Sequence, residues 1–136
     1  MCEGVMYLYQ KRLITLYFQH PQAKLPIKRT FGENALITWG RRQNDKGQLP
    51  FGGWARLEAI NRGMWDPYFP KPVKIPLIKF MQKDMMGSGQ WFDITKGYWV
   101  QGLVAQQDKE RRVYIVTINP ELPEAIYDSW PRIIYQ

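Results

Sequence analysis

The chain has 136 residues, 45% of them hydrophobic, and carries 19 Lys and Arg against 12 Asp and Glu, a formal net charge of +7. This length fits a single domain, residues 1–136, with enough apolar material for a proper core. One cysteine excludes a disulfide framework, and no stretch reaches the roughly 20 apolar residues of a membrane helix or reads as a signal peptide. We therefore expect a cytoplasmic protein with no membrane partner.

The charge and the aromatic content together suggest a partner. A domain this basic has the electrostatic footprint of a polyanion binder. Aromatic residues make up 15% of the chain, and rings among cations suit single-stranded nucleic acid, in which bases stack and phosphates meet positive charge. Single-stranded DNA is the expected partner. Most of the aromatic residues are nevertheless expected in the core of a β-rich fold.

The predicted elements are mostly short strands. Residues 5–9 and 13–18 are rich in β-branched and aromatic side chains, and with the polar segment 10–12 between them they predict a hairpin or two adjacent strands. A strand at 35–39 and a short helix at 55–62 follow. The later predicted elements are a proline-containing edge strand at 73–81, a hairpin of 91–95 and 98–105 around Lys96-Gly97, a strand at 113–117, a helix from Asn119 to about residue 126, and a strand at 132–135. This pattern predicts an α+β fold in which a strand-dominated antiparallel sheet closes into a barrel-like single domain with short helices.

Residues 49–60, LPFGGWARLEAI, combine features that a simple connection does not need. Two glycines let the backbone turn beside the apolar anchor Trp54. Arg56 and Glu58 then place opposite charges two residues apart. The segment is a candidate site, and the alternative is a surface helix with both charges in solvent.

Other polar positions give weaker signals. The pair Arg41-Arg42 follows a strand-ending tryptophan and could clamp a phosphate, although such pairs are commonly only solvated. His20, the one histidine, lies in a polar turn and is not expected to be catalytic. The sequence has no phosphate-binding loop and no Cys/His cluster, so neither a metal nor a cofactor is expected.

Cys2 suggests specific chemistry. If Met1 is removed, Cys2 carries an α-amine and a thiol on adjacent carbons. An α-amine has a pKa of about 7.7 to 8, so far more of it is neutral at pH 7 than of a lysine. A neutral amine attacks an aldehyde, and the thiol can then close a thiazolidine ring. The ring-opened abasic site is an aldehyde carried on a polyanion. The alternative is an inert, buried thiol.

The order of several short blocks resembles the SOS-response-associated peptidase (SRAP) family. These blocks span nearly the whole chain: Met1-Cys2, ITWG at 37–40, ARLE at 55–58, VYIVT at 113–117, and IYD at 126–128 with Pro131. The resemblance implies the SRAP fold, crosslinking to abasic sites in single-stranded DNA through the N-terminal cysteine, and autoproteolysis before that cysteine. The chain would be a divergent and shortened member, with a phage origin left open.

The resemblance also assigns roles to residues. Cys2 would be the nucleophile with Glu58 as an acidic partner, and Arg56 would contact a phosphate. Thr117 matches a threonine that ends the late strand of the family, while Trp54 and Tyr127 replace its asparagine and histidine. The arginine next to the family's cysteine is missing, and Glu3 is present instead. Lys83 falls in the position of the catalytic glutamate, where a lysine cannot act as a carboxylate proton shuttle.

Two functions therefore remain open. One is a divergent SRAP-like enzyme that binds single-stranded or abasic-site DNA and crosslinks to it through Cys2, with thiol autopeptidase activity. The other is a catalytically degenerate binding or accessory protein on the same fold, using a basic groove with Trp54, Arg56 and the Arg41-Arg42 pair. An unrelated enzyme using Tyr127, Glu58 and Asp128 has only residue types in its favour.

Overall fold

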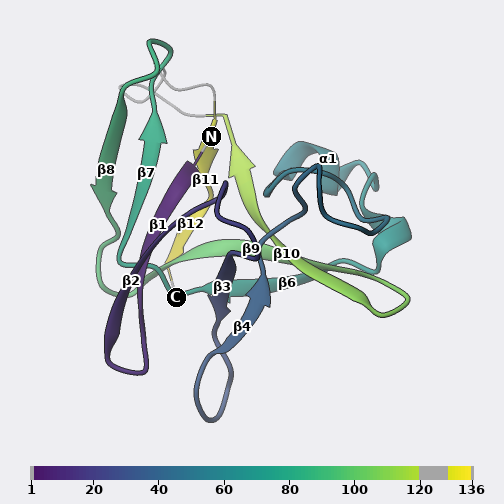
Figure 1. Cartoon of the computed structure of the whole chain (residues 1–136), viewed down its shortest axis with the longest axis horizontal. Helices are drawn as coiled ribbons and strands as arrows, with labels where there is room; N and C mark the ends of the chain where they lie inside the picture. The colour runs from purple at the N-terminus through teal and green to yellow at the C-terminus, as the bar shows by residue number, and fades with distance from the viewer. Residues whose placement is uncertain (1, 120–128, 136) are drawn as a thin grey trace.

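Two β-sheets and a separate two-stranded ribbon form most of the molecule (Figure 1). The computed structural model describes residues 2–119 and 129–135. The first sheet is antiparallel and has the strand order β2-β1-β7-β8. Its strands are β1 (Cys2–Tyr9), β2 (Arg12–Tyr17), β7 (Lys79–Lys83) and β8 (Gly89–Asp93).

The second sheet is built around its two longest strands, which pair with each other and with four shorter ones. These six strands are β9 (Tyr98–Gln107), β10 (Glu110–Ile118), β5 (Trp54–Arg56), β6 (Lys71–Ile75), β11 (Trp130–Pro131) and β12 (Ile133–Tyr135). The ribbon consists of β3 (Lys24–Ile27) and β4 (Ala35–Thr38). The helical elements are α1 (Leu57–Asn61) and the 3-10 turn η1 (Asp66–Tyr68).

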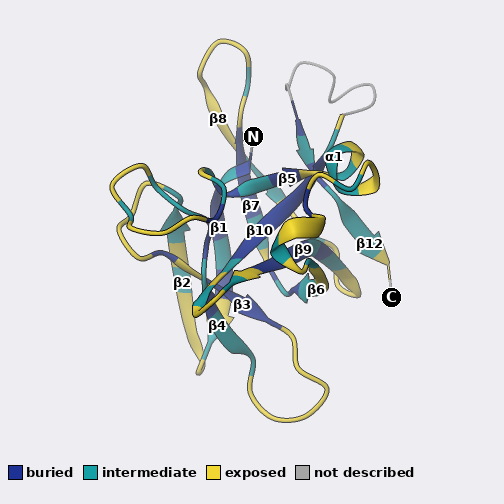
Figure 2. Ribbon diagram, turned by 90° about the vertical axis from the view of Figure 1, so that its right-hand side faces the viewer, coloured by how far each residue is buried: buried dark blue, intermediate teal, exposed yellow. Residues whose placement is uncertain are grey.

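Both faces of β10 are buried (Figure 2). Successive side chains of a strand point to opposite faces, so Val113 and Ile115 join the main core while Tyr114 and Val116 join a second cluster. The main core also takes side chains from the first sheet and the ribbon. The second cluster is covered by Leu57 and other apolar residues of α1 and η1. This arrangement explains the unbroken apolar run at 113–116.

The predicted fold class is confirmed in its main feature, because strands dominate and the large sheet curls into a half-barrel. The sheet is not wholly antiparallel, since β5 runs parallel to β10. The first predicted hairpin is confirmed. Gln10 and Lys11 both have positive φ, 51° and 65°, as expected in the two-residue turn of a type I′ hairpin.

Three predicted elements are wrong in detail. Residues 91–95 and 98–105 do not form a hairpin, because β8 pairs with β7 and β9 belongs to the other sheet. The predicted strand 73–81 is two strands in different sheets, separated around Pro76. The helix at 55–62 is shorter, since residues 54–56 are drawn into pairing with β10. The predicted helix from Asn119 lies, apart from its first residue, outside the described residues.

Candidate nucleic-acid interface

Cys2 lies in β1 directly opposite Gln82 of β7, and its side chain is fully buried. Burial raises the pKa of the Cys2 thiol to about 12, because the thiolate would lose its hydration. The thiol Sγ donates to the Gly4 carbonyl at 3.7 Å. At neutral pH the sulfur is therefore a protonated, weakly nucleophilic group packed in the core.

The neighbours of Cys2 do not supply a proton shuttle from the opposite strand. Gln82 is also fully buried and donates through Nε2 to the Ser129 carbonyl at 2.7 Å. Lys83 points to the other face of β7, where its ammonium lies 3.2 Å from the Glu3 carboxylate. The residue facing Cys2 is thus an amide, and the Glu3–Lys83 ion pair is directed away from the thiol.

Trp54 is built into the structure around Cys2. Its indole Nε1 donates to the Cys2 carbonyl at 2.7 Å. Its ring packs against Phe18 and Trp39, with centroid separations of 4.8 and 6.1 Å. The structure therefore connects Trp54 with Cys2 and uses the indole for packing and for a main-chain hydrogen bond.

Arg41 and Arg42 both donate hydrogen bonds to main-chain carbonyls of the protein. Arg41 donates to the carbonyls of Asp45 and Leu49. Arg42 donates to the carbonyls of Phe18 and Trp39 at 2.8 Å each, and burial lowers its pKa. Arg41 thus holds carbonyls of the loop at residues 40–50, and Arg42 holds carbonyls that precede this loop, which leaves few of their donors for a phosphate.

The pairing of β5 with β10 brings three predicted residues together. Arg56 lies opposite Thr117 in the parallel register, and both line a hollow of about 260 Å³ together with Glu58. Arg56 is exposed and donates to Asn119 Oδ1 at 2.7 Å. The Glu58 carboxylate is 68% exposed and lies 3.7 Å from the Arg62 guanidinium. The hollow is open to solvent, and Cys2 is not among its lining residues. Tyr127 and Asp128 lie outside the described residues.

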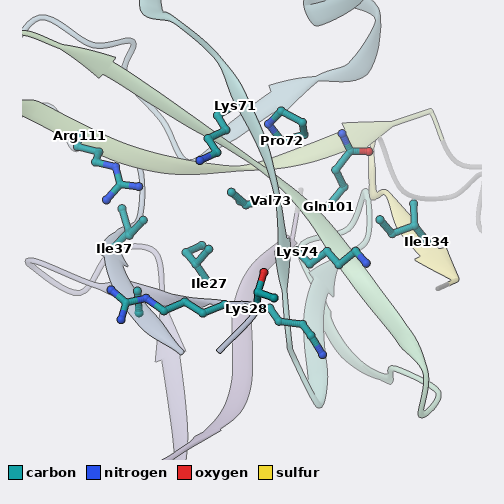
Figure 3. Close-up of a pocket in the computed structure, with 13 residues that line it drawn as sticks. Ile27, Lys28, Ile37, Lys71, Pro72, Val73, Lys74, Gln101, Arg111 and Ile134 are labelled. Carbon is teal, nitrogen blue, oxygen red and sulfur yellow. The ribbon is translucent and has the colours of Figure 1, made fainter. Parts of the chain in front are cut away.

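A larger feature was not predicted from the sequence. A groove of about 840 Å³ runs between the ribbon and the edge strand β6 (Figure 3). Its apolar floor includes Ile27, Ile37 and Val73. We call it the basic groove, because five cations and no acidic residue line it among the described residues: Lys28, Arg29, Lys71, Lys74 and Arg111. It differs from the groove expected from the sequence, since none of Trp54, Arg56, Arg41 and Arg42 lines it.

The cations are spread along the basic groove. In Figure 3, Lys71 and Arg111 lie on the side of Ile37, whereas Lys74 lies on the side of Ile134. Within the described residues none of the five cations forms an ion pair. Ion pairs elsewhere on the molecule involve Lys79, Lys83, Arg42, Arg62 and Arg112. Positive charge is therefore left free at this groove.

The sequence held two usable signals for the basic groove. Lys28-Arg29 is an adjacent basic pair of the same kind as Arg41-Arg42. Lys74 lies in the predicted edge strand 73–81, and Lys71 lies just before it. What the sequence could not show is that these segments and Arg111 meet, because β3 was not predicted.

Comparison of the chain with protein-family models, curated proteins and solved structures finds no match. No described helix is long and apolar enough to cross a membrane. Within residues 2–119 and 129–135, no group of three or more His, Cys, Asp and Glu side chains is placed to hold a metal ion.

Proposed function

We propose that this protein binds single-stranded nucleic acid without covalent chemistry, and that the strand lies in the basic groove. The observation that carries the proposal is the groove itself, in which five cations without ion-pair partners in the described structure surround an apolar floor. Cations along a groove follow a phosphate backbone, and apolar surface between them accommodates unpaired bases. The formal net charge of +7 favours the same class of partner.

An acidic peptide fits the basic groove less well than a nucleic acid. Extended peptides usually bind a sheet edge by adding a strand, which needs free main-chain donors and acceptors. Along the outer edge of β6, Pro72 has no N–H, and the Lys74 carbonyl already accepts the Lys28 N–H at 2.9 Å. Proline and lysine are typical of edges that resist strand addition.

The environment of Cys2 favours the noncovalent function. A crosslink would need the thiol to ionise or its amine to reach an aldehyde, yet the side chain is fully buried and its pKa is raised to about 12. The facing residue is Gln82, which cannot exchange a proton as a carboxylate does. Noncovalent binding in the basic groove does not require the Cys2 thiol to become exposed or ionised.

The proposal is tested by fluorescence anisotropy with a labelled single-stranded oligonucleotide. Lys71→Glu/Lys74→Glu reverses two charges of the basic groove. Lys11→Glu/Arg12→Glu makes the same change in net charge, from +7 to +3, on the exposed β1–β2 hairpin, which does not line the groove. We expect the groove variant to bind at least about tenfold more weakly and the control to bind within about twofold of the wild type.

Two results would contradict the proposal. Equal losses in the two variants would mean that binding follows net charge and not the basic groove. Unchanged binding by a folded groove variant would remove the groove from the interface. Thermal unfolding of both variants serves as the check on folding.

A further inference from the structure

Trp99 lies beneath two of the cations of the basic groove. It is on β9, directly opposite Ile134 of β12, which lines the groove. The Lys28 ammonium lies 4.1 Å from the centroid of the Trp99 ring, and the Lys74 ammonium lies 6.0 Å from it. The indole Nε1 is buried and has no hydrogen-bond partner among the described residues. In this part of the chain, packing and cation–π contacts therefore hold the ring.

This arrangement places side by side the two kinds of group that bind a nucleotide, a cation for its phosphate and an aromatic ring for its base. Ammonium groups bind phosphate, and an indole face stacks on a base. In the unbound protein Lys28 covers the ring, which keeps an apolar face out of water. A phosphate that draws Lys28 toward itself would uncover that face for the adjacent base, and stacking on the base would replace the cation–π contact.

We infer that Trp99 is the base-stacking platform of the basic groove and that Lys28 is its cover, so that the groove prefers strands with bases to phosphate polymers without them. The inference rests on the proposed function and adds to it a means of recognising the base. Trp54, the tryptophan that the sequence suggested for contact with DNA, instead packs in the core beside Cys2.

The experiment compares two probes of equal length, an oligothymidine and an oligomer of abasic deoxyribose-phosphate spacers, at one salt concentration. We expect wild-type protein to bind the oligothymidine about fivefold or more tightly than the spacer strand, the range that stacking on one base provides. Trp99→Leu should abolish this preference without weakening binding to the spacer strand, because the ring makes no contact with a strand that has no bases. The matched control is Trp91→Leu, which removes a half-buried tryptophan on β8 that packs against Tyr17, and it should keep the preference.

A second variant keeps the test decisive if Trp99→Leu does not fold. Lys28→Ala removes the cover and a phosphate ligand while leaving the ring, so the spacer strand should bind more weakly and the preference for bases should persist or increase. A folded Trp99→Leu that keeps the preference, or a Lys28→Ala that loses it, overturns the inference.

The two proposals fail in different ways. Loss of binding to both probes in the groove variant Lys71→Glu/Lys74→Glu supports the proposed function whatever Trp99 does. Equal wild-type affinity for the two probes overturns the stacking role alone. Absence of wild-type binding to either probe overturns both.

Discussion

The side chain of Cys2 occupies an environment that suppresses its reactivity. It is fully buried in the main core opposite the Gln82 amide, and its sulfur donates to the Gly4 carbonyl. The loss of hydration on burial outweighs the charges that act on the thiol. Low-pKa cysteines are found where positive charge and solvent access coincide. The residue behaves as a small apolar group of the core, the alternative that its sequence position left open.

This environment predicts slow thiol chemistry in the native protein. With a pKa of about 12, roughly one thiol in ten thousand is ionised at pH 8, against about one in four for an exposed cysteine. An aromatic disulfide reagent at pH 8 should therefore react slowly with native protein and rapidly in denaturant, and Cys2→Ser should give no signal in either state. Rapid labelling of the native protein would show that the thiol is accessible and would reopen the covalent function.

The candidate residues show which properties of a site can be predicted from sequence. Arg56, Glu58 and Thr117 do share a hollow, because the ARLE block and the late strand pair directly. The same sequence gives no indication that Trp54 and Arg42 direct their donors to main-chain carbonyls of other segments. Residue type predicts what a side chain can bind, whereas the partner it takes depends on tertiary contacts.

At the scale of elements, the loop at residues 40–50 is fixed by Glu110 of β10. One carboxylate oxygen accepts the Gln48 N–H at 2.8 Å, and the other accepts the Arg112 guanidinium at 2.7 Å. Arg112 in turn donates to the Gly40 carbonyl. Burial raises the pKa of Glu110, but these hydrogen bonds outweigh it, and the net pKa is lowered.

The lowered pKa of Glu110 makes its hydrogen bonds to the loop at residues 40–50 and to Arg112 sensitive to acid. A carboxyl group whose pKa falls on folding contributes stability above the pKa of the unfolded chain, and loses it as the pH falls through the folded value, so below about pH 4. Glu110→Gln should cost about 1 to 3 kcal/mol at pH 7 in urea unfolding, and this difference from the wild type should shrink toward pH 3. Glu58→Gln, at an exposed ion pair, should change stability by less than about 0.5 kcal/mol. A pH-independent cost at Glu110 would contradict the role of its charge.

Elements defined by local signals were predictable, and those defined by distant pairing were not. The first hairpin follows from its own turn, in which Gln10 and Lys11 adopt positive φ. Lys96-Gly97 looked like a second hairpin turn, but Trp91 faces Met81 of β7. Strand β3 contains Pro26 and was missed, since its pairing with β4 is stabilised by burial of Leu25 and Ile27 in the main core.

At the scale of the whole molecule, the distribution of charge matters more than its sum. The described ion pairs neutralise cations on several other elements. The basic groove gathers five cations from β6, β10 and the segment after β3, and none of them forms an ion pair within the described residues. Composition predicted a polyanion partner but could not place it. The groove is produced by the packing of the ribbon against β6, which brings together residues about 45 positions apart in the chain.

The salt dependence of binding to a single-stranded oligonucleotide tests the central claim most directly. Each phosphate neutralised on a single strand contributes about −0.7 to the slope of log affinity against log salt, so five contacts in the basic groove give a slope of up to about −3.5. For Lys71→Glu/Lys74→Glu the slope should be shallower by about 1.4, while Lys11→Glu/Arg12→Glu should keep the wild-type slope. A flat salt response, or one slope shared by wild type and both variants, would contradict nucleic-acid binding in the basic groove.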